Sequence, residues 1–211
     1  MLFDFADLAP KDRYKLLVST VVPRPIAWVV TQGRDGRRNA AAFSFFNAFG
    51  DEPPVIVIGV GRRSSGDKKD TAANIHETGQ FVVNLVSAEA AEAMNVTAIE
   101  FGPEVDEIAE AGLTALPSVK VAPPRLAESP VAMECERLVI LDLHPSWSLI
   151  VGRVLAMHVR DDAVMDPAKC YIDTTKLDLI GRMHGRGLYA RTRDLFDMPR
   201  IPVQDWTRAA E

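Results

Sequence analysis

The chain has 211 residues, of which 47% are apolar and 25% are charged, and its formal net charge is −5. This composition is typical of a globular domain that buries its own core, and the acidic balance disfavours nucleic acid as a partner. Because no apolar run is long enough to span a membrane and the first residues lack the pattern of a signal peptide, we expect a cytoplasmic protein with no membrane partner.

In the first half of the chain, short helices alternate with strands. A helix is predicted over 12–19, and two β-rich segments, 24–32 and 38–43, flank Gly33-Arg34-Asp35-Gly36, a sequence typical of a hairpin turn. An apolar run over 54–61 predicts a strand buried on both faces. It is followed by a helix over 70–78 that Gly79 ends, a strand over 81–86 and an alanine-rich helix over 88–96.

The second half is irregular over 102–124, with a short helix predicted at 105–111, and then becomes β-rich. Long apolar segments at 132–143 and 148–159 surround a turn at 144–147, which predicts an antiparallel meander. The segment 199–206 has too few apolar residues to form an element alone, so we expect it to wrap over a neighbour. Together these elements predict an antiparallel β-barrel with helices over its ends.

We expect a single domain over 1–211, with its core at about 22–191 and a tail, 192–211, that packs on the barrel or on a dimer partner. The two cysteines, Cys135 and Cys170, lie far apart in a chain without an export signal, which predicts reduced core thiols. The four histidines show no spacing typical of a metal site, so no metal is expected.

The segment 62–74, RRSSGDKKDTAAN, follows the predicted strand 54–61 and leads into a helix. Cations, hydroxyls and backbone N–H groups at a helix N-terminus form a good anion site, and a phosphate is its natural ligand. Lys69 and Thr71 are the strongest candidates, with support from Arg62 or Arg63, and Asp70 must act as an N-cap or pair with an arginine. The alternative is a solvated surface loop.

Two further segments could contact a ligand. Within 31–46, Asn39 and Ser44 offer hydrogen bonds, and three small residues, Ala40, Ala41 and Ala42, would let a flat ring approach the backbone. The alternative is a strand with small residues under a helix. The segment 181–189 places Arg and His between glycines, which suits a loop that closes on a ligand or, equally, a flexible turn.

A dinucleotide-binding turn is a competing interpretation of Gly59-Val60-Gly61. The third glycine of the G-x-G-x-x-G motif is missing, the next helix starts too late, and the surrounding strands are predicted to be antiparallel. The sequence therefore disfavours a Rossmann fold.

Four segments in order resemble the flavin reductase-like FMN-binding split-barrel family, which includes flavoredoxins and NAD(P)H:flavin oxidoreductases. They are VVPRPIAWVVT (21–31), DGRRNAAAFSFFNAFGDEPPVIVIGVG (35–61), KKDTAANIHETGQFVVNLV (68–86) and IGRMHGRGLYAR (180–191). The resemblance implies a six-stranded antiparallel Greek-key split barrel and a homodimer with FMN, or FAD, near the interface.

The resemblance also implies which residues bind the flavin. Its ring would lie against the segment 39–42, and the late GR…Y segment would border the flavin. Its phosphate would be held by Ser44, Ser64 or Ser65, Lys69 and Thr71. The cofactor-binding residues expected on this basis are Thr31, Asn39, Ala40, Ala41, Ala42, Ser44, Arg62, Ser64, Ser65, Lys69, Thr71, Arg182 and Tyr189. His184 is the candidate for a residue that faces the nicotinamide or a second flavin.

The function expected from this resemblance is NAD(P)H-dependent reduction of flavin, with an oxygenase or another electron acceptor as partner. A flavoredoxin-like electron carrier or flavin-storage protein is the main alternative. A split-barrel protein that binds another ligand, or none, is a third class, because fold does not fix function.

Overall fold

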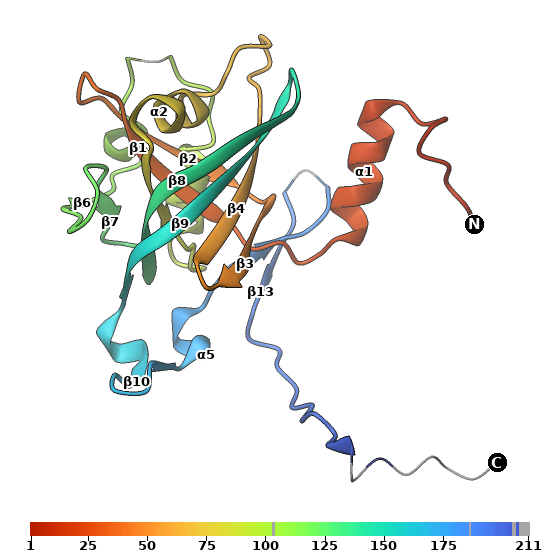
Figure 1. Cartoon of the computed structure of the whole chain (residues 1–211), viewed down its shortest axis with the longest axis vertical. Helices are drawn as coiled ribbons and strands as arrows, with labels where there is room; N and C mark the ends of the chain where they lie inside the picture. The colour runs from red at the N-terminus through yellow and green to blue at the C-terminus, as the bar shows by residue number, and fades with distance from the viewer. Residues whose placement is uncertain (103, 186, 204–205, 207–211) are drawn as a thin grey trace.

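Seven antiparallel strands form the main sheet of the computed structural model, which describes residues 1–102, 104–185, 187–203 and 206. The sheet curves strongly, and its order is β2-β1-β5-β8-β9-β4-β3 (Figure 1). These strands are β1 (Ala27–Gln32), β2 (Arg38–Phe43), β3 (Phe46–Asp51), β4 (Pro54–Gly61), β5 (Gln80–Asn84), β8 (Val131–His144) and β9 (Trp147–Val159).

The sheet is not closed into a barrel, and it has seven strands where six were predicted. Its edge strands, β2 and β3, follow each other in the chain, and the Gly59 N–H donates to the Phe45 carbonyl at 2.7 Å at the bend between them. The sequence of β3, FNAFGD, has neither an apolar run nor an alternating pattern. This strand forms because its backbone pairs with β4, which no local pattern reveals.

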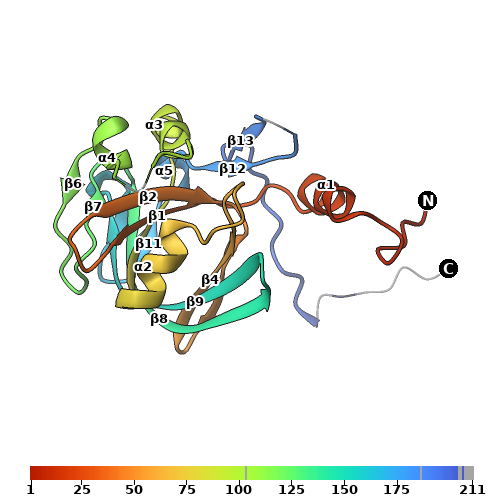
Figure 2. The ribbon, with the colours of Figure 1, turned by 90° about the horizontal axis from the view of Figure 1, so that it is seen from above.

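Helices and three small two-stranded sheets surround the main sheet. Figure 2 shows α2 inside the curve of the sheet, with α3 and α4 on the opposite side of β1 and β2. The helices are α1 (Pro10–Thr20), α2 (Asp70–Thr78), α3 (Ala91–Val96), α4 (Glu107–Glu110), α5 (Thr174–Leu177) and the 3-10 helix η1 (Asp161–Ala163). The small sheets pair β6 (Ala115–Leu116) with β7 (Arg125–Leu126), β10 (Val164–Asp166) with β11 (Tyr171–Ile172), and β12 (Ile180–Arg182) with β13 (Tyr189–Arg191).

Several predicted elements are confirmed. α2 and β4 have the predicted bounds, and Gly79 ends α2 with a φ of 73°, the left-handed conformation that favours glycine. The two long strands β8 and β9 form the predicted hairpin. α3 and α4 are shorter than expected, and burial of β4 is incomplete because Pro54 at its start is exposed.

The strand β1 is apolar because both of its faces are buried. Trp28 and Val30 point into one hydrophobic cluster with α3 and α4, whereas Ala27 and Val29 point into another inside the curve of the sheet. Ile75 brings α2 into this second cluster. The two clusters hold β1 rigidly, and through it the neighbouring β2.

The side chain of Trp147, at the start of β9, explains why positions 59 and 61 of β4 are glycines. A Cβ on Gly61 would lie 2.9 Å from Trp147 Cζ3, and one on Gly59 would lie 3.3 Å from Trp147 Cζ2. The indole therefore packs across the two glycines, so the Gly-x-Gly motif accommodates a side chain in an antiparallel sheet. Trp147 also meets the Phe45 ring edge-on, with 5.1 Å between the ring centroids, and Phe45 contacts Tyr14 of α1.

Both cysteines are free, as predicted, but only Cys135 is a core residue. Burial raises the pKa of its thiol far above the usual range. Cys170 is exposed, which corrects the expectation of two core thiols, because it stands in a turn between β10 and β11 with a φ of 56°. Within the described residues, no helix is both long enough and apolar enough to cross a membrane.

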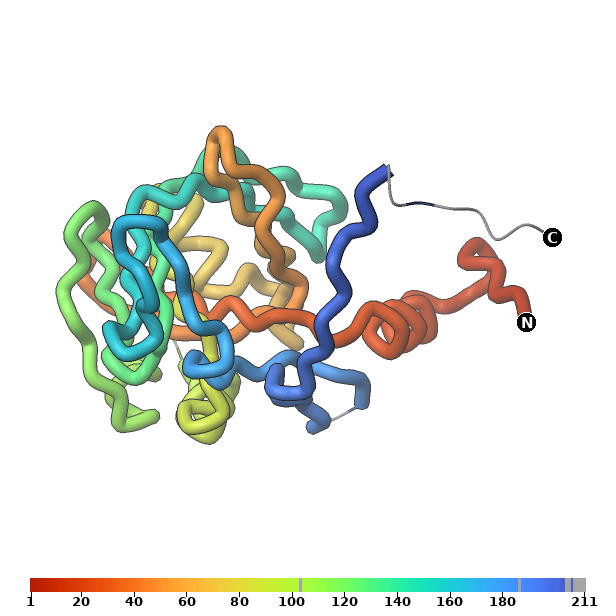
Figure 3. Tube along the Cα trace, turned by 90° about the horizontal axis from the view of Figure 1, so that it is seen from below, coloured from red at the N-terminus to blue at the C-terminus, as the bar shows by residue number. Residues whose placement is uncertain are grey.

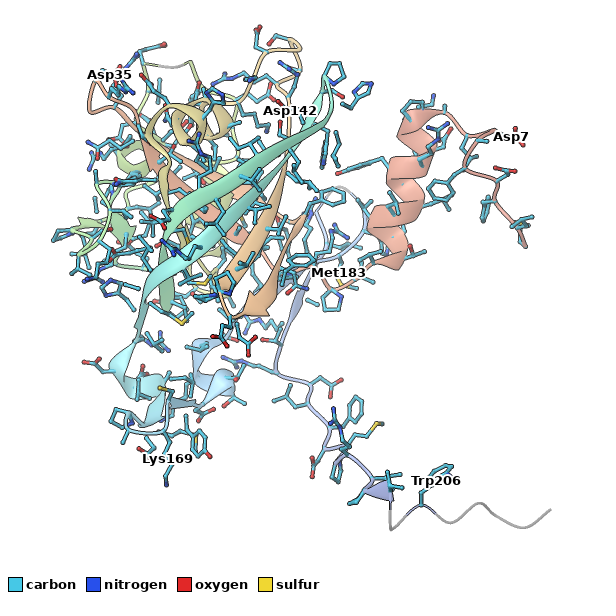
Figure 4. The ribbon with its side chains drawn as sticks, viewed as in Figure 1. Asp7, Asp35, Asp142, Lys169, Met183 and Trp206 are labelled. Carbon is cyan, nitrogen blue, oxygen red and sulfur yellow. The ribbon has the colours of Figure 1, made fainter. Side chains whose placement is uncertain are left out.

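The described part of the C-terminal tail extends away from the sheet, on the same side as the N-terminal segment (Figure 3). Trp206 lies far from the sheet in Figure 4. The apolar side chains of the tail are exposed to solvent in the single chain; they are Leu195, Phe196, Met198, Ile201, Val203 and Trp206. The predicted packing of the tail, on the barrel or on a dimer partner, stays a prediction, and residues 204–205 and 207–211 lie outside the described residues.

Candidate functional site

One edge of β2 faces no other strand, because β2 lies at the end of the sheet. The Ala40 N–H points to this edge, where it donates to Oε2 of Glu107 at 3.2 Å. Since backbone groups of alternate residues in a strand point to the same side, those of Ala42 face the same edge. With only a methyl group on Ala42, a flat ligand could approach its N–H and C=O groups closely.

A groove made of two cavities runs along this free edge. The smaller, the α2 cavity, has a volume of about 110 Å³. The larger, the β13 cavity, has a volume of about 520 Å³. Ala42 and Ala98 line both, so the two cavities are neighbours. The predicted site residues Asn39, Ala41, Lys69 and Thr71 line the α2 cavity, and Ser44, Arg182 and Tyr189 line the β13 cavity.

At the α2 cavity, a buried hydrogen bond joins β2 to the start of α2. Nδ2 of Asn39 donates to Oγ1 of Thr71 at 3.0 Å, and both residues are buried. Because the Thr71 oxygen accepts this bond, its own proton remains for a ligand. Thr71 stands in the first turn of α2, where unpaired backbone N–H groups and the helix dipole also favour an anion.

Lys69 precedes this helix, and its Nζ lies 5.8 Å from the centroid of the Phe43 ring. Asp70, which would repel an anion, is paired with Arg63, as one of the two predicted alternatives required. Arg63 also donates to the Phe101 carbonyl at 3.1 Å and lines the α2 cavity. The Asp70 charge is thus balanced by Arg63. Lys69 is a second cation at the cavity, where it also interacts electrostatically with Glu100.

At the β13 cavity, Arg24 holds the surroundings of Ser44 in place. The Arg24 side chain donates to Oγ of Ser44 at 3.3 Å and to the carbonyls of Val18, Val21 and Met183. Met183 lies where α1 meets the sheet (Figure 4). Burial lowers the pKa of this guanidinium. Ser44 thereby accepts through its oxygen and keeps its proton for the cavity. Arg24 was not predicted, because its contacts to Ser44 and Met183 lie 20 and 159 residues away in the chain.

On the far side of the same cavity, the Arg182 guanidinium lies over the Tyr189 ring, 4.6 Å from the centroid. The pair sits on the small β12–β13 sheet, which is joined to the main body by reciprocal backbone hydrogen bonds between Arg182 and Arg24. A cation held on an aromatic ring is a rigid place to meet an anionic or aromatic ligand.

Glu107 is a buried acid that the sequence did not single out. It lines the α2 cavity and accepts the Ala40 N–H, and burial raises the pKa of its carboxyl group. The neighbouring carboxylates Asp70 and Asp106 raise it further. No local signal marks Glu107, since α4 is a single turn of helix.

Six predicted residues do not line the groove: Thr31, Ala40, Arg62, Ser64, Ser65 and His184. Thr31 is fully buried and accepts from Nδ2 of Asn74 at 3.0 Å, while Arg62 donates to the carbonyls of Pro145 and Gly66. Ser64 donates to Glu100 at 2.6 Å, which lowers the pKa of that carboxyl group, and Ser65 donates to Asp67 at 2.8 Å. His184 is exposed.

Of the two arginines Arg62 and Arg63, it is thus Arg63 that faces the cavity. The backbone N–H of Ala40 already donates to Glu107, so Glu107 occupies the position from which a ligand would accept this bond. No group of three or more His, Cys, Asp or Glu in the described ranges could hold a metal ion. The groove therefore offers backbone edges, small side chains and cations rather than metal ligands.

Comparison with known proteins gives a consistent picture. The sequence model of the flavin reductase like domain matches residues 18–175. Two solved structures share 32% sequence identity and a TM-score of 0.87 with this chain. One is the 2-nitrobenzoate 2-nitroreductase of Pseudomonas fluorescens, where the match covers 96% of this chain and 97% of that one. The other is component B of the nitrilotriacetate monooxygenase of Bacillus cereus, with 94% and 98% covered.

A Shewanella frigidimarina protein with a split-barrel domain is similar in fold, with a TM-score of 0.81 at 21% identity over 95% of this chain and 100% of that chain. It supports a split-barrel arrangement, with the difference that the sheet described above is open and has seven strands.

Proposed function

This chain belongs to the family of flavin reductase like domains, and from that premise we propose that it is an FMN-binding oxidoreductase that reduces flavin with NAD(P)H. The observation that carries the proposal is the groove along the free edge of β2. It joins small residues and open backbone groups, suited to a flat ring, to a cationic helix N-terminus suited to a phosphate.

The residues that would hold FMN fall into two groups. Lys69, Thr71 and the first N–H groups of α2 would bind the phosphate, while Ala41 and Ala42 would lie under the ring. Ser44 and the Arg182–Tyr189 pair would border the ring from the β13 cavity. The flavin, when bound, supplies the electron-transfer chemistry, so the protein has to position it and exclude water.

Of the two flavin nucleotides, we propose FMN as the ligand rather than FAD. The α2 cavity is small, at about 110 Å³, which supports a ligand that ends in one phosphate group. FAD binding would require its adenosine half to leave the groove past the loop at 98–101. We therefore expect FMN to bind more tightly than FAD in a direct titration of the purified protein.

The reaction is tested by mixing the FMN-loaded protein with NADH and with NADPH in a stopped-flow instrument and following the loss of flavin absorbance. Fast bleaching by either nucleotide, compared with free FMN, is the expected result. Slow bleaching by both would favour the alternative, a flavoredoxin-like electron carrier or flavin store. His184 stays a candidate residue for contact with the nicotinamide, and an unchanged rate in His184→Ala would reject that role.

We also propose that the protein is a homodimer and delivers electrons to an oxygenase. The exposed apolar residues of the tail and of the β8–β9 hairpin, such as Phe196 and Leu143, support burial against a second copy. The similarity to a monooxygenase component B supports an oxygenase partner. Sedimentation at several protein concentrations tests the first proposal, and coupled product formation with a candidate oxygenase tests the second.

A further inference from the structure

A third cavity lies outside the groove, on the other side of α3. Its volume is about 540 Å³, and none of its lining residues lines the α2 or β13 cavity. Ala90 and Ala93 form its wall at α3, and the rest is built from the segment 111–113, the end of β7 and the segment after it, and the adjoining ends of β8 and β9. The flavin reaction proposed above makes no use of this cavity.

Arg125 lines this cavity without a partner. Its Nε is buried and has no hydrogen-bond partner, and its guanidinium makes no hydrogen bond or ion pair with any residue that the structure describes. By contrast, Arg160, which lines the same cavity, donates to Asp162 at 2.7 Å and to the Lys176 carbonyl at 2.5 Å. A partly buried guanidinium that lacks partners is costly, and a carboxylate is the group that satisfies its planar fork of donors best.

His158 provides a second polar group, and it is held in a fixed orientation. Its Nε2 lies 2.6 Å from Oε1 of Glu134, a carboxyl group with no exposed surface. Burial opposes the charge on Glu134, but N–H groups of Val119 and Lys120 and the His158 contact outweigh it and lower the pKa of this carboxyl group. In the tautomer that donates Nε2–H to this carboxylate, Nδ1 is an acceptor, so it can receive a hydrogen bond from a donor group of a ligand.

Acidic residues limit the charge that the ligand can carry. Glu89, Glu128 and Asp161 also line the cavity, and Glu128 accepts the Thr114 N–H at 2.9 Å. These carboxylates would repel a phosphate or a second carboxylate, whereas one carboxylate bound to Arg125 leaves the rest of the ligand free to be neutral or cationic.

From these contacts we propose that this cavity is a second ligand site, for a small molecule with a single carboxylate that is anchored by Arg125, while Nδ1 of His158 accepts from a donor group elsewhere in the ligand. The proposal does not depend on flavin binding. The carboxylate could belong to a simple organic acid or to an amino acid, whose ammonium group would face the acidic residues.

The test is isothermal titration of the full-length protein with benzoate, L-leucine and inorganic phosphate as probes. We expect saturable binding of benzoate or L-leucine, the stronger of the two identifying the source of the carboxylate, and weaker binding of phosphate. Arg125→Met should lower the affinity at least about tenfold, since it removes a bidentate charge-assisted contact. Arg125→Lys should give a partial loss, and Arg153→Met, which removes an exposed arginine of β9 outside the cavity, should change nothing.

A structural role for Arg125 gives different results. If its purpose were to stabilise the fold, Arg125→Met would lower the melting temperature of the ligand-free protein. A carboxylate site instead predicts an unchanged or raised melting temperature, because the substitution removes an unpaired guanidinium. The absence of saturable binding by both carboxylates, tighter binding of phosphate, or equal affinity in Arg125→Met would each overturn the proposal.

Discussion

Nδ2 of Asn39 donates to Oγ1 of Thr71 at 3.0 Å, and this buried bond couples the strand at the proposed flavin ring to the helix at the proposed phosphate. The two ends of the groove are therefore fixed relative to each other before a ligand arrives. A preformed site of this kind loses little conformational entropy on binding. The bond also orients the Thr71 hydroxyl, so Asn39 can influence the phosphate without touching it.

Removing this bond should weaken both the fold and the site. Asn39→Ala leaves the buried Thr71 hydroxyl without its donor, which costs about 1–3 kcal/mol of unfolding free energy. Chemical denaturation measures this loss, and FMN titration should show a weaker affinity as well. Asn47→Ala, an exposed position on β3, serves as the control. Full stability in Asn39→Ala would show that the bond does not contribute.

The raised pKa of Glu107 predicts a pH-dependent stability. Because its carboxyl group holds a proton more tightly in the folded chain, its contribution to stability is complete below the unfolded pKa of about 4.3 and is lost as pH rises through the higher folded value. Glu107→Gln keeps an oxygen for the Ala40 N–H but cannot ionise.

The difference in unfolding free energy between Glu107→Gln and the parent should therefore increase in favour of the variant as pH rises from about 4 to 8. Denaturation across this range measures it. Glu110→Gln, at an exposed position in the same helix, should show no such trend. A constant difference across the range would mean that burial does not shift the Glu107 pKa.

The packing of Trp147 on β4 predicts that Gly61 cannot be enlarged without cost. Gly61→Ala would bring a methyl group to 2.9 Å from Trp147 Cζ3, so the indole or the hairpin must move. Overpacking of this kind costs about 1–3 kcal/mol, and it should lower the melting temperature measured by circular dichroism. At Gly187 an added Cβ meets nothing within 4 Å, so Gly187→Ala is the matched control. Equal melting temperatures for the two variants would contradict the packing argument.

The exposed apolar side chains of the tail predict that substitutions among them will weaken the proposed homodimer. If the apolar residues of the tail bury themselves on a second copy, replacing Phe196 and Ile201 together by serine should weaken the dimer and leave the sheet intact. Sedimentation velocity measures the first effect and far-ultraviolet circular dichroism the second. A parent protein that stays monomeric at all accessible concentrations would remove the basis for this prediction.

Local sequence patterns were sufficient to predict the elements that are defined by their own residues, such as α2 and the β8–β9 hairpin. The bounds of α2 follow from an apolar strand, a polar loop and Gly79, and the β8–β9 hairpin follows from two long apolar segments. The strand β3 was missed because only pairing with β4 defines it. The count of six strands implied by the family resemblance was wrong for the main sheet, which has seven, although the antiparallel arrangement was right.

The candidate site was predicted in part. The resemblance brought Asn39, Lys69 and Thr71 into one site, and these three residues line one cavity. It could not show that the hydroxyls of Ser64 and Ser65 bind nearby carboxylates in this structure. Arg24 binds Ser44 and Met183, which lie 20 and 159 residues away, and Glu107 binds Ala40, which lies 67 residues away. No short sequence motif can identify contacts over such separations.

The most direct test of FMN binding in the groove is a comparison of FMN and riboflavin affinities in the parent and in Lys69→Ala, by flavin fluorescence quenching. Loss of a charge-assisted contact to phosphate is worth about 1.5–3 kcal/mol, so FMN should bind roughly 10- to 150-fold more weakly while riboflavin is unaffected. Lys68→Ala, at the exposed neighbouring position, should leave both affinities unchanged. Equal weakening of FMN and riboflavin, or no saturable FMN binding by the parent, would contradict the account.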